Sequence, residues 1–449
     1  MKTRFFLFFF SVFQSFFAQK TIQEQLDVKV NQLLASEPMY SGSLSFYVSD
    51  ESGNKIYEYQ ANKGLSTAST MKIFTAAAAL ETLGKDYQYK TKIAFDGNLY
   101  ITSNGDPTLG NDRFEGYKAD NFKQKVIETL KQNRISKISG DLIIDDTCFD
   151  FQKIPGGWPW NDMGNYYGAG VWGVNWRENV FEINTFGKEI KNFSNINDVK
   201  WVNELRTEGN SDKSIIYTAP YSDVVHINGS LPAKDMKVSG AMPNPPKQLA
   251  IELAEEFKKQ KIAFNGKIII NSEKIINGEK PVVFPENKVI LEYKSPTLDK
   301  IVYWFLKKSV NLFGETFIKT MAKEKTDNPS FESGVKYLKN FWKDKGIDQR
   351  MINFVDGSGL SPQNYASSKA EVQALLWAKK QPWFDAYYDG FPVMANGMKM
   401  KSGSIKDSRA FAGFHTSATG KNYVFSIIMN NYQANDLSNA LYNVLNVLK

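Results

Sequence analysis

Hydrophobic positions recur at helical spacing along several parts of the chain. Between residues 20 and 38, the apolar side chains are Ile22, Leu26, Val30, Leu33 and Leu34, a pattern that places them on one helix face. The segment 69–83 is small and apolar, and it is followed by Gly84, a residue that commonly ends helices. The same periodicity predicts further helices at 122–133, 250–262, 298–325 (one helix or two), 333–344 and 435–449.

Alternating apolar and polar positions predict strands near both ends of the chain. Residues 42–60 alternate around a Ser-Gly-Asn turn and residues 408–432 around a Thr-Gly-Lys-Asn turn, so each segment is predicted to form a hairpin. From about 92 to 284 the strand-like runs are short and rich in Gly, Asn, Asp and Pro, and longer helical patterns return from about 285. This layout predicts an α+β fold in which a turn-rich insert interrupts an outer domain.

The chain opens with a segment typical of a secretory signal peptide. Lys2 and Arg4 form a basic start, Phe5–Phe17 form a short apolar core, and Ala18 is a small residue suited to cleavage. We therefore predict a signal peptide over residues 1–18 and a periplasmic protein. No other segment approaches the ~18 consecutive apolar residues of a spanning helix, so no integral membrane span is expected.

The predicted domain organisation follows from these patterns. The outer domain is expected from two separate parts of the chain, 19–91 and 285–449. The inserted accessory region between them, 92–284, is expected to hold two nested subdomains, about 92–180 with 250–284, and about 181–249.

Composition narrows the functional classes. The 449 residues are 42% hydrophobic and 23% charged, as in ordinary globular proteins. The net charge of +7 falls to about +5 without the basic signal residues, and no concentrated basic stripe indicates a nucleic-acid partner. Cys148 is the only cysteine and lies in a run that predicts a buried strand, so no internal disulfide can form. With only two histidines in addition, we expect no metal and no cofactor.

A Ser-x-x-Lys motif offers a nucleophile with a base one helical turn away. The motif begins at Ser52, Ser69 and Ser333, but only Ser69 is followed by a long apolar helix. Residues three apart share a helix face, so Lys72 is expected to lie over Ser69. A serine hydroxyl is a poor nucleophile unless a neighbour takes its proton. Taken alone, the motif leaves open that Ser69 merely caps the helix.

Two further motifs lie far along the chain, Ser-Val-Asn at 309–311 and Lys-Ser-Gly at 401–403. With Ser-x-x-Lys they form, in this order, the set found in penicillin-binding proteins and β-lactamases. A second hydroxyl and a second cation can relay a proton and keep an amine neutral. Asn311 can hydrogen-bond a peptide backbone and Lys401 can bind a carboxylate, while Gly403 lets a substrate approach an edge strand closely.

The chain resembles the D-alanyl-D-alanine carboxypeptidase/endopeptidases, the class C low-molecular-mass penicillin-binding proteins. The resemblance covers nearly the whole mature chain and includes the long gap between the first and second motifs. Four more segments are similar to family motifs: GDPTL at 105–109, SGDLIID at 139–145, GWPWNDM at 157–163 and DGSGLS at 356–361. Turns and packing are the simpler explanation for most of them, with Trp158 and Trp160 in the core.

The resemblance implies both a fold and a reaction. The fold is a penicillin-binding, serine β-lactamase-like transpeptidase domain, an antiparallel sheet flanked by helices, carrying the turn-rich insert. Ser69 would attack the penultimate D-alanine carbonyl of a peptidoglycan stem peptide and form an acyl-enzyme, with Lys72 as the base. Ser309 would pass a proton to the leaving D-alanine, and Asn311 would hold the substrate backbone. Water would then release the acyl group.

The resemblance also implies the groups that bind substrate. Lys401 and Ser402 would bind the terminal carboxylate, and the backbone amides of Ser69 and Ser404 would form the oxyanion hole. Gly403 lies between these two serines on the same predicted strand.

The GWPWNDM loop is similar to one that helps to read the stem-peptide side chain in this family. Asp162 and Tyr167 are the candidates for binding the amino end of diaminopimelate. Many relatives have arginine after DGSGLS, where this chain has Pro362. Since proline cannot bind an anion, side-chain specificity is altered or supplied elsewhere.

The expected partners are peptidoglycan stem peptides, with β-lactam antibiotics as covalent inhibitors, and the sequence leaves a homo-oligomer open. Three other functions are weighed against the DD-peptidase. An exported serine β-lactamase would use the same motifs, and a non-catalytic wall-binding protein would keep only the fold. A Ser-His-Asp hydrolase is disfavoured because no G-x-S-x-G motif is present and His415 lies in a strand-like run.

Overall fold

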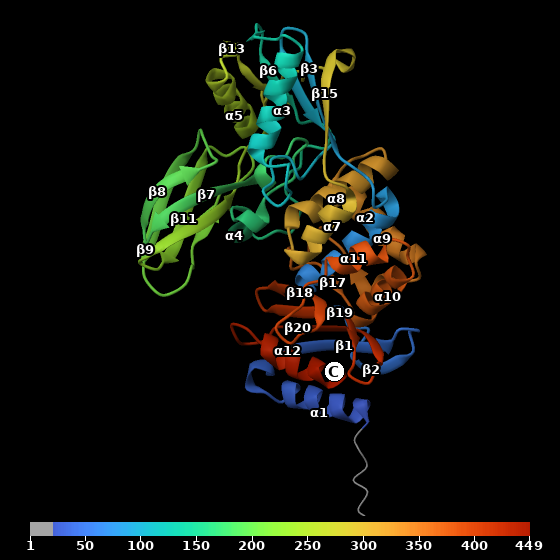
Figure 1. The fold of residues 1–449 in the computed structure, drawn as a ribbon. Coiled ribbons are helices and arrows are strands. Elements are labelled where there is room, and N and C mark those ends of the chain that lie inside the picture. The colour runs from blue at the N-terminus through green and yellow to red at the C-terminus, as the bar shows by residue number, and fades with distance from the viewer. Residues whose placement is uncertain (1–20) are drawn as a thin grey trace, which may run out of the picture.

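Both ends of the chain contribute strands to one five-stranded sheet, drawn in the lower half of Figure 1. The computed structural model describes residues 21–449, and the signal peptide predicted at 1–18 lies outside them. The sheet is antiparallel throughout, which confirms both predicted hairpins. In spatial order its strands are β18 (Lys399–Ile405), β19 (Ser408–Thr416), β20 (Asn422–Asn430), β1 (Ser43–Asp50) and β2 (Lys55–Tyr59).

Two helices from the chain ends cover one face of this sheet. They are α1 (Ile22–Leu34) and α12 (Ser438–Leu445), which lie beside each other below the strands in Figure 1. Leu26 and Leu441 of these helices pack with Phe46 and Phe411 of the strands. Tyr47, the next residue after Phe46, joins the core on the opposite face, as the alternation of side chains along a strand requires.

A helical layer covers the other face and contains the largest buried cluster of the described residues. Its helices are α2 (Lys72–Leu83), α7 (Leu298–Lys307), α8 (Asn311–Lys325), α9 (Phe331–Asp344), α10 (Ser368–Lys379) and α11 (Phe384–Asp389). The first of them runs through the middle of the layer, and its residues 72–80 are all buried. Four consecutive alanines allow neighbouring helices to approach it closely. The helix ends at Gly84, which has a positive φ of 86° that favours glycine.

The insert has its own mixed five-stranded sheet, at the top of Figure 1. Its spatial order is β14 (Ile268–Ile270), β6 (Leu142–Asp145), β4 (Leu99–Ser103), β3 (Lys90–Phe95) and β15 (Val289–Lys294). Helices α3 (Ala119–Gln132) and α5 (Pro245–Lys259) pack their apolar faces on this sheet. Small elements complete this part: β5 (Lys137–Ile138) paired with β13 (Ala263–Phe264), and α6 (Asn271–Ile276).

A β-rich arm projects from the insert and is green in Figure 1. It consists of two three-stranded sheets. One contains β10 (Ile215–Tyr217), β11 (Val224–Leu231) and β9 (Lys200–Thr207), and the other contains β12 (Asp235–Ala241), β7 (Val180–Phe186) and β8 (Glu189–Ser194). Side chains of both sheets, among them Ile183, Ile216 and Val225, form one buried cluster. The short helix α4 (Trp160–Met163) lies against β10.

The domain boundaries remain a proposal, and strand pairing favours a small adjustment to them. Strand β15 pairs antiparallel with β3, so residues 289–294 share the sheet of the insert. We propose that the insert leaves the outer domain near residue 90 and rejoins it near residue 295. The short strands β16 (Ile352–Asn353) and β17 (Tyr365–Ala366) then belong to the outer domain.

The strand predicted around Cys148 is wrong at the cysteine itself. Strand β6 ends at Asp145, and Cys148 lies in the following turn, where its thiol donates a hydrogen bond to the carbonyl oxygen of Gly173. Burial raises the pKa of this thiol to about 11, so it is a weak nucleophile at neutral pH. Among residues 21–449, no helix combines the length and the apolar character needed to cross a bilayer.

Candidate active site

Ser69 lies in a tight turn immediately before helix α2. The turn spans Ala68–Met71 in a 3₁₀ conformation, and Lys72 is the first residue of α2. The cap positions of the turn and the helix are Thr67 and Met71, and neither makes a side-chain cap hydrogen bond. The Ser69 hydroxyl instead accepts a hydrogen bond from Lys72 Nζ at 2.9 Å. The alternative that Ser69 merely caps the helix is therefore wrong.

Lys72 is completely buried, and its ammonium is held by three acceptors. Its Nζ lies 2.9 Å from Ser69 Oγ, 2.7 Å from Asn311 Oδ1 and 2.7 Å from the carbonyl oxygen of Ser358. Burial lowers the pKa of Lys72 to about 7, against the opposing effect of Asp356 and Glu315. An amine with this pKa can accept a proton from a hydroxyl at neutral pH.

Ser309 and Asn311 stand at the junction between α7 and α8. The region predicted as one helix or two is two helices, and Ser309 lies between them with a positive φ of 58°, a strained conformation for a residue other than glycine. Ser309 Oγ accepts a hydrogen bond from Lys401 Nζ at 3.1 Å. Asn311 donates from Nδ2 to the backbone carbonyl of Tyr167 at 2.8 Å and accepts from Lys72. Asn311 therefore links the lysine to the wall of the cleft.

Lys401 lies on the edge strand β18, and its side chain extends toward Ser309. Its Nζ donates to Ser309 Oγ and, at 2.7 Å, to the carbonyl oxygen of Ser402. The side chain is almost fully buried. Burial, together with the positive charges of Lys72 and Arg409, holds the pKa of Lys401 well below its usual value. The charge of Lys72 thus opposes protonation of Lys401, which favours a neutral amine at one of the two lysines.

Packing within the protein, and not only the approach of a substrate, requires glycine at position 403. A methyl group there would lie 2.3 Å from the carbonyl oxygen of Thr67 and 2.9 Å from the backbone nitrogens of Ser69 and Thr70. The turn that carries the nucleophile therefore packs directly on strand β18. The sequence suggested that glycine leaves room for a substrate, whereas the observed contact is with the Ser69 turn.

We expect Gly403→Ala to destabilise the fold and to slow acylation by penicillin. The added methyl group must displace the Ser69 turn, and such overpacking costs about 1–3 kcal/mol. Urea unfolding would give the loss of stability, and a fluorescent penicillin would give the acylation rate. Gly156→Ala is the matched control because a methyl group at Gly156 meets nothing within 4 Å. Equal behaviour of the two variants would contradict the packing role.

A loop that the sequence suggested to be mainly a turn supplies part of the site. The Asp356 carboxylate in DGSGLS accepts hydrogen bonds from Gly359 N (2.7 Å), Ser361 N (2.7 Å), Asn364 Nδ2 (2.9 Å) and Trp158 Nε1 (2.9 Å). These bonds fix the loop so that the Ser358 carbonyl faces Lys72. Backbone groups leave no residue-specific signal in a sequence, so this acceptor was not predicted.

Glu315 is a second buried group that sequence reasoning missed. Its Oε2 accepts a hydrogen bond from Gly357 N at 2.9 Å. Burial and nearby Asp356 raise the pKa of Glu315 to about 8. Residues 311–322 of α8 are all buried and yet include this acid, but this burial is a property of the folded structure and gave no signal in the sequence. A charge on a fully buried helix marks a position held by specific partners.

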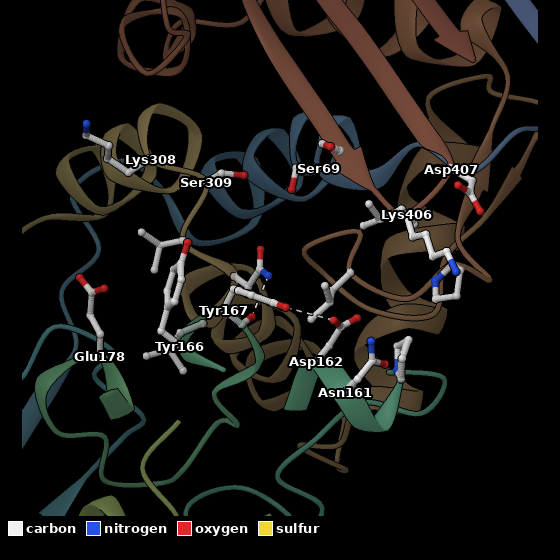
Figure 2. Close-up of a pocket in the computed structure, with 18 of the residues that line it drawn as sticks. Ser69, Asn161, Asp162, Tyr166, Tyr167, Glu178, Lys308, Ser309, Lys406 and Asp407 are labelled. Atoms are coloured by element: carbon white, nitrogen blue, oxygen red, sulfur yellow. Dashed lines mark hydrogen bonds between the residues drawn. The ribbon is translucent and has the colours of Figure 1, made fainter. Parts of the chain in front are cut away.

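The catalytic candidates open onto a cleft of about 750 Å³ between the two halves of the molecule. Figure 2 shows Ser69 and Ser309 side by side on one wall, facing Asp162 and Tyr167 on the other. The Tyr167 hydroxyl donates to Asp162 Oδ1 at 3.2 Å. Burial raises the pKa of Asp162. Pro362 lines the cleft, and its lining also contains three cations that sequence reasoning did not name: Arg113, Lys308 and Lys406.

The structure brings most of the predicted site residues together. Hydrogen bonds connect Ser69, Lys72 and Asn311 in one group and Ser309 with Lys401 in another. The cleft is lined by Ser69, Ser309, Asn311, Ser404, Asp162 and Tyr167. Ser402 and Gly403 lie on the same edge strand outside this lining. Within residues 21–449 no cluster of three or more acids, histidines or cysteines has the arrangement of a metal site.

This geometry defines a class of protein. A serine hydroxyl paired with a buried, low-pKa lysine at a helix start, beside the edge strand of an antiparallel sheet, is the arrangement of an acyl-transfer enzyme with a lysine base. Residues 26–448 match the model of the D-Ala-D-Ala carboxypeptidase 3 (S13) family. The chain belongs to this family and is a serine-type D-Ala-D-Ala carboxypeptidase, a penicillin-binding hydrolase.

Individual relatives can be aligned with this protein over most of its length. A D-alanyl-D-alanine carboxypeptidase of Haemophilus influenzae is 24% identical over 92% of this chain and 90% of its own length. One from an Actinomadura species is 24% identical over 89% of this chain and 80% of its own length. The crystal structure of penicillin binding protein 4 (dacB) from Haemophilus influenzae matches the fold with a TM-score of 0.75 at 22% identity, covering 92% of this chain and 97% of that one.

Proposed function

We propose that the protein cleaves D-alanyl bonds of peptidoglycan stem peptides through an acyl-enzyme on Ser69. The observation that carries this proposal is the 2.9 Å contact between Ser69 Oγ and a buried lysine whose pKa is about 7. Neutral Lys72 takes the hydroxyl proton while Ser69 Oγ bonds to the carbonyl carbon of the penultimate D-alanine. The charge that develops on the carbonyl oxygen is held by the backbone amides of Ser69 and Ser404.

The leaving D-alanine needs a proton, which we assign to Ser309. As the peptide C–N bond breaks, the Ser309 hydroxyl gives its proton to the departing amine and is reprotonated from the ammonium of Lys72. Lys401 supports this transfer because its Nζ donates a hydrogen bond to Ser309 Oγ at 3.1 Å. Water then attacks the ester carbon, Lys72 takes its proton, and the shortened peptide is released as Ser69 is regenerated.

We assign the terminal carboxylate of the substrate to the β18 end of the cleft. The Lys401 amine lies just below the surface, where a bound carboxylate would favour its protonated form, and Ser402 and Ser404 lie on the same strand. Asn311, which lines the cleft, holds the substrate backbone as well as Lys72. Gly403 contributes by letting the Ser69 turn pack on this strand.

Side-chain recognition is assigned to the opposite wall. Asp162 and Tyr167 form a hydrogen-bonded pair that lines the cleft and suits the amino end of a diamino acid such as diaminopimelate. Pro362 occupies the position where an arginine would bind a carboxylate. If the substrate side chain carries a carboxylate, the cations available to it include Lys406 and Lys308 in the same lining.

We propose that this reaction takes place in the periplasm, after export by the predicted signal peptide. β-Lactam antibiotics are expected to acylate Ser69 in place of the peptide, because they present a reactive carbonyl to the same nucleophile.

The balance of carboxypeptidase and endopeptidase activity is tested by incubating the protein with purified muropeptides and analysing them by mass spectrometry. We expect monomeric pentapeptides to lose the mass of one alanine, because the cleft presents Ser69 to a free peptide end. Conversion of cross-linked dimers to monomers would add endopeptidase activity. Absence of both changes, with the protein folded, would contradict the proposed function.

A further inference from the structure

An exposed tryptophan, Trp160, stands in the chain between two residues that line the cleft, is not part of the lining itself, and has no role in the chemistry above. Trp160 belongs to the GWPWNDM segment, and packing in the core was the simpler expectation for both of its tryptophans. Trp158 is buried and bonded to Asp356, but Trp160 is 53% exposed. The next two residues, Asn161 and Asp162, line the cleft. Trp160 is therefore an exposed ring that directly precedes the cleft-lining residues in the chain.

Trp160 is the first of a row of rings that continues onto the β-rich arm. Its ring centroid lies 6.1 Å from that of Tyr217, with 31° between the planes. The Tyr217 ring lies 5.4 Å from that of His226, with 22° between the planes. Tyr217 is paired across the sheet with His226, and His226 with Val202, which is 45% exposed. The three rings form the aromatic row, and the exposed Val202 lies beside its last member.

The aromatic row is held firmly against the cleft wall. A methyl group at Gly164 would lie 2.1 Å from the carbonyl oxygen of Ile216, so the loop and strand β10 are in close backbone contact. Asn165 adds a hydrogen bond from Ile216 N to its Oδ1 at 3.3 Å. The aromatic row is thus already in place before any ligand binds, which reduces the entropy lost on binding.

Polar groups beside the rings can bind hydroxyl and amide groups. Glu204 Oε2 lies 2.7 Å from His226 Nε2 and accepts from Asn228 Nδ2 at 3.4 Å. Flat rings next to side-chain donors and acceptors match a sugar, whose C–H faces stack on rings while its hydroxyls need hydrogen bonds.

We propose that the aromatic row binds the glycan strand of peptidoglycan, the saccharide to which the stem peptide is attached. This inference rests on the proposed function, which places the diamino acid of the stem at Asp162. Two residues separate that diamino acid from the sugar, a span of about 7 Å when extended. The sugar would therefore emerge from the cleft where Trp160 and Tyr217 present their rings.

The test compares substrates with and without sugar. For Trp160→Ala we expect the KM for disaccharide-pentapeptide to rise about tenfold, as loss of one aromatic contact does, while the KM for the free pentapeptide stays unchanged. Trp160→Phe, which keeps a ring, should raise the KM for disaccharide-pentapeptide less than Trp160→Ala does. Tyr217→Ala should raise it as Trp160→Ala does. Tyr40→Ala is the control because Tyr40 is a 90% exposed ring near α1, remote from the cleft. Equal KM changes for both substrates would overturn the proposal, since Trp160 would then act only by positioning Asp162.

A second measurement is independent of peptidase activity. Glycan strands stripped of their peptides should bind the wild-type protein and lose about tenfold in affinity for Trp160→Ala. Retention of full affinity would overturn the glycan site even if D-alanine release proceeds normally. Conversely, failure of the wild type to react with penicillin or to release D-alanine would refute the proposed function and leave this binding result standing on its own.

Discussion

Replacing Ser69 with alanine is expected to abolish covalent labelling by penicillin and release of D-alanine. Without the hydroxyl no acyl-enzyme can form, and loss of the nucleophile lowers the turnover of a serine hydrolase by on the order of a million-fold. Labelling with a fluorescent penicillin followed by gel electrophoresis measures the first effect, and the muropeptide assay measures the second. Lys72 loses only one of its three acceptors in this variant, so the fold is expected to persist.

Ser52→Ala provides the matched control. Ser52 begins an identical Ser-x-x-Lys sequence, but it lies in the exposed turn between β1 and β2. This variant should label as strongly as the wild type. Undiminished labelling of Ser69→Ala would refute the assignment of the nucleophile. A penicilloyl adduct that is long-lived on the wild type would favour the peptidase, whereas rapid release of hydrolysed drug would favour a β-lactamase.

Local patterns were sufficient to predict the elements that carry the chemistry. The hairpins β1–β2 and β19–β20 and the apolar helix after Ser69 follow from periodicity within short windows. The three short motifs also predicted that residues 69, 309 and 401 would meet, although more than 300 positions separate the first from the last. Their order and residue types narrowed the chemistry before any distance was known.

Side-chain environments that depend on distant segments could not be read from the sequence. Trp158 and Trp160 are two positions apart in one motif, yet one is buried against Asp356 and the other stacks on Tyr217. Which of the two side chains is buried depends on a strand about 60 residues and a loop about 200 residues further along the chain. The same limit applies to Gly403, whose need for a small residue comes from the Ser69 turn.

The pKa of Lys72 also depends on the packing of the whole fold. A Ser-x-x-Lys sequence places the amine near the hydroxyl, but it does not lower the pKa of the amine. The lowering comes from complete burial by the surrounding helices and loops, opposed by Asp356 and Glu315. Neither acid was identified as part of the site from the sequence, so the pH dependence follows only from the structure.

The second large effect is expected for Lys72→Arg, which keeps a positive charge but cannot act as a base near neutral pH. Arginine stays protonated throughout the range in which proteins fold, so acylation should fall at least about 1,000-fold. In the wild type, Lys72 is protonated below its pKa of about 7 and cannot take the serine proton. The acylation rate constant should therefore rise about tenfold per pH unit up to about pH 7 and level off above it.

The pH profile separates loss of the base from loss of structure. Residual acylation in Lys72→Arg should show no inflection near pH 7, because the titrating group is gone. Lys55→Arg is the matched control, since Lys55 occupies the same place in the exposed motif and pairs with Glu58 at the surface; its rate and profile should equal those of the wild type. Because arginine is larger than the site it must enter, Lys72→Met should be measured as well, with circular dichroism to confirm folding. A folded Lys72→Met protein that acylates at the wild-type rate, or a wild-type profile that is flat between about pH 5 and 8, would show that another group takes the serine proton.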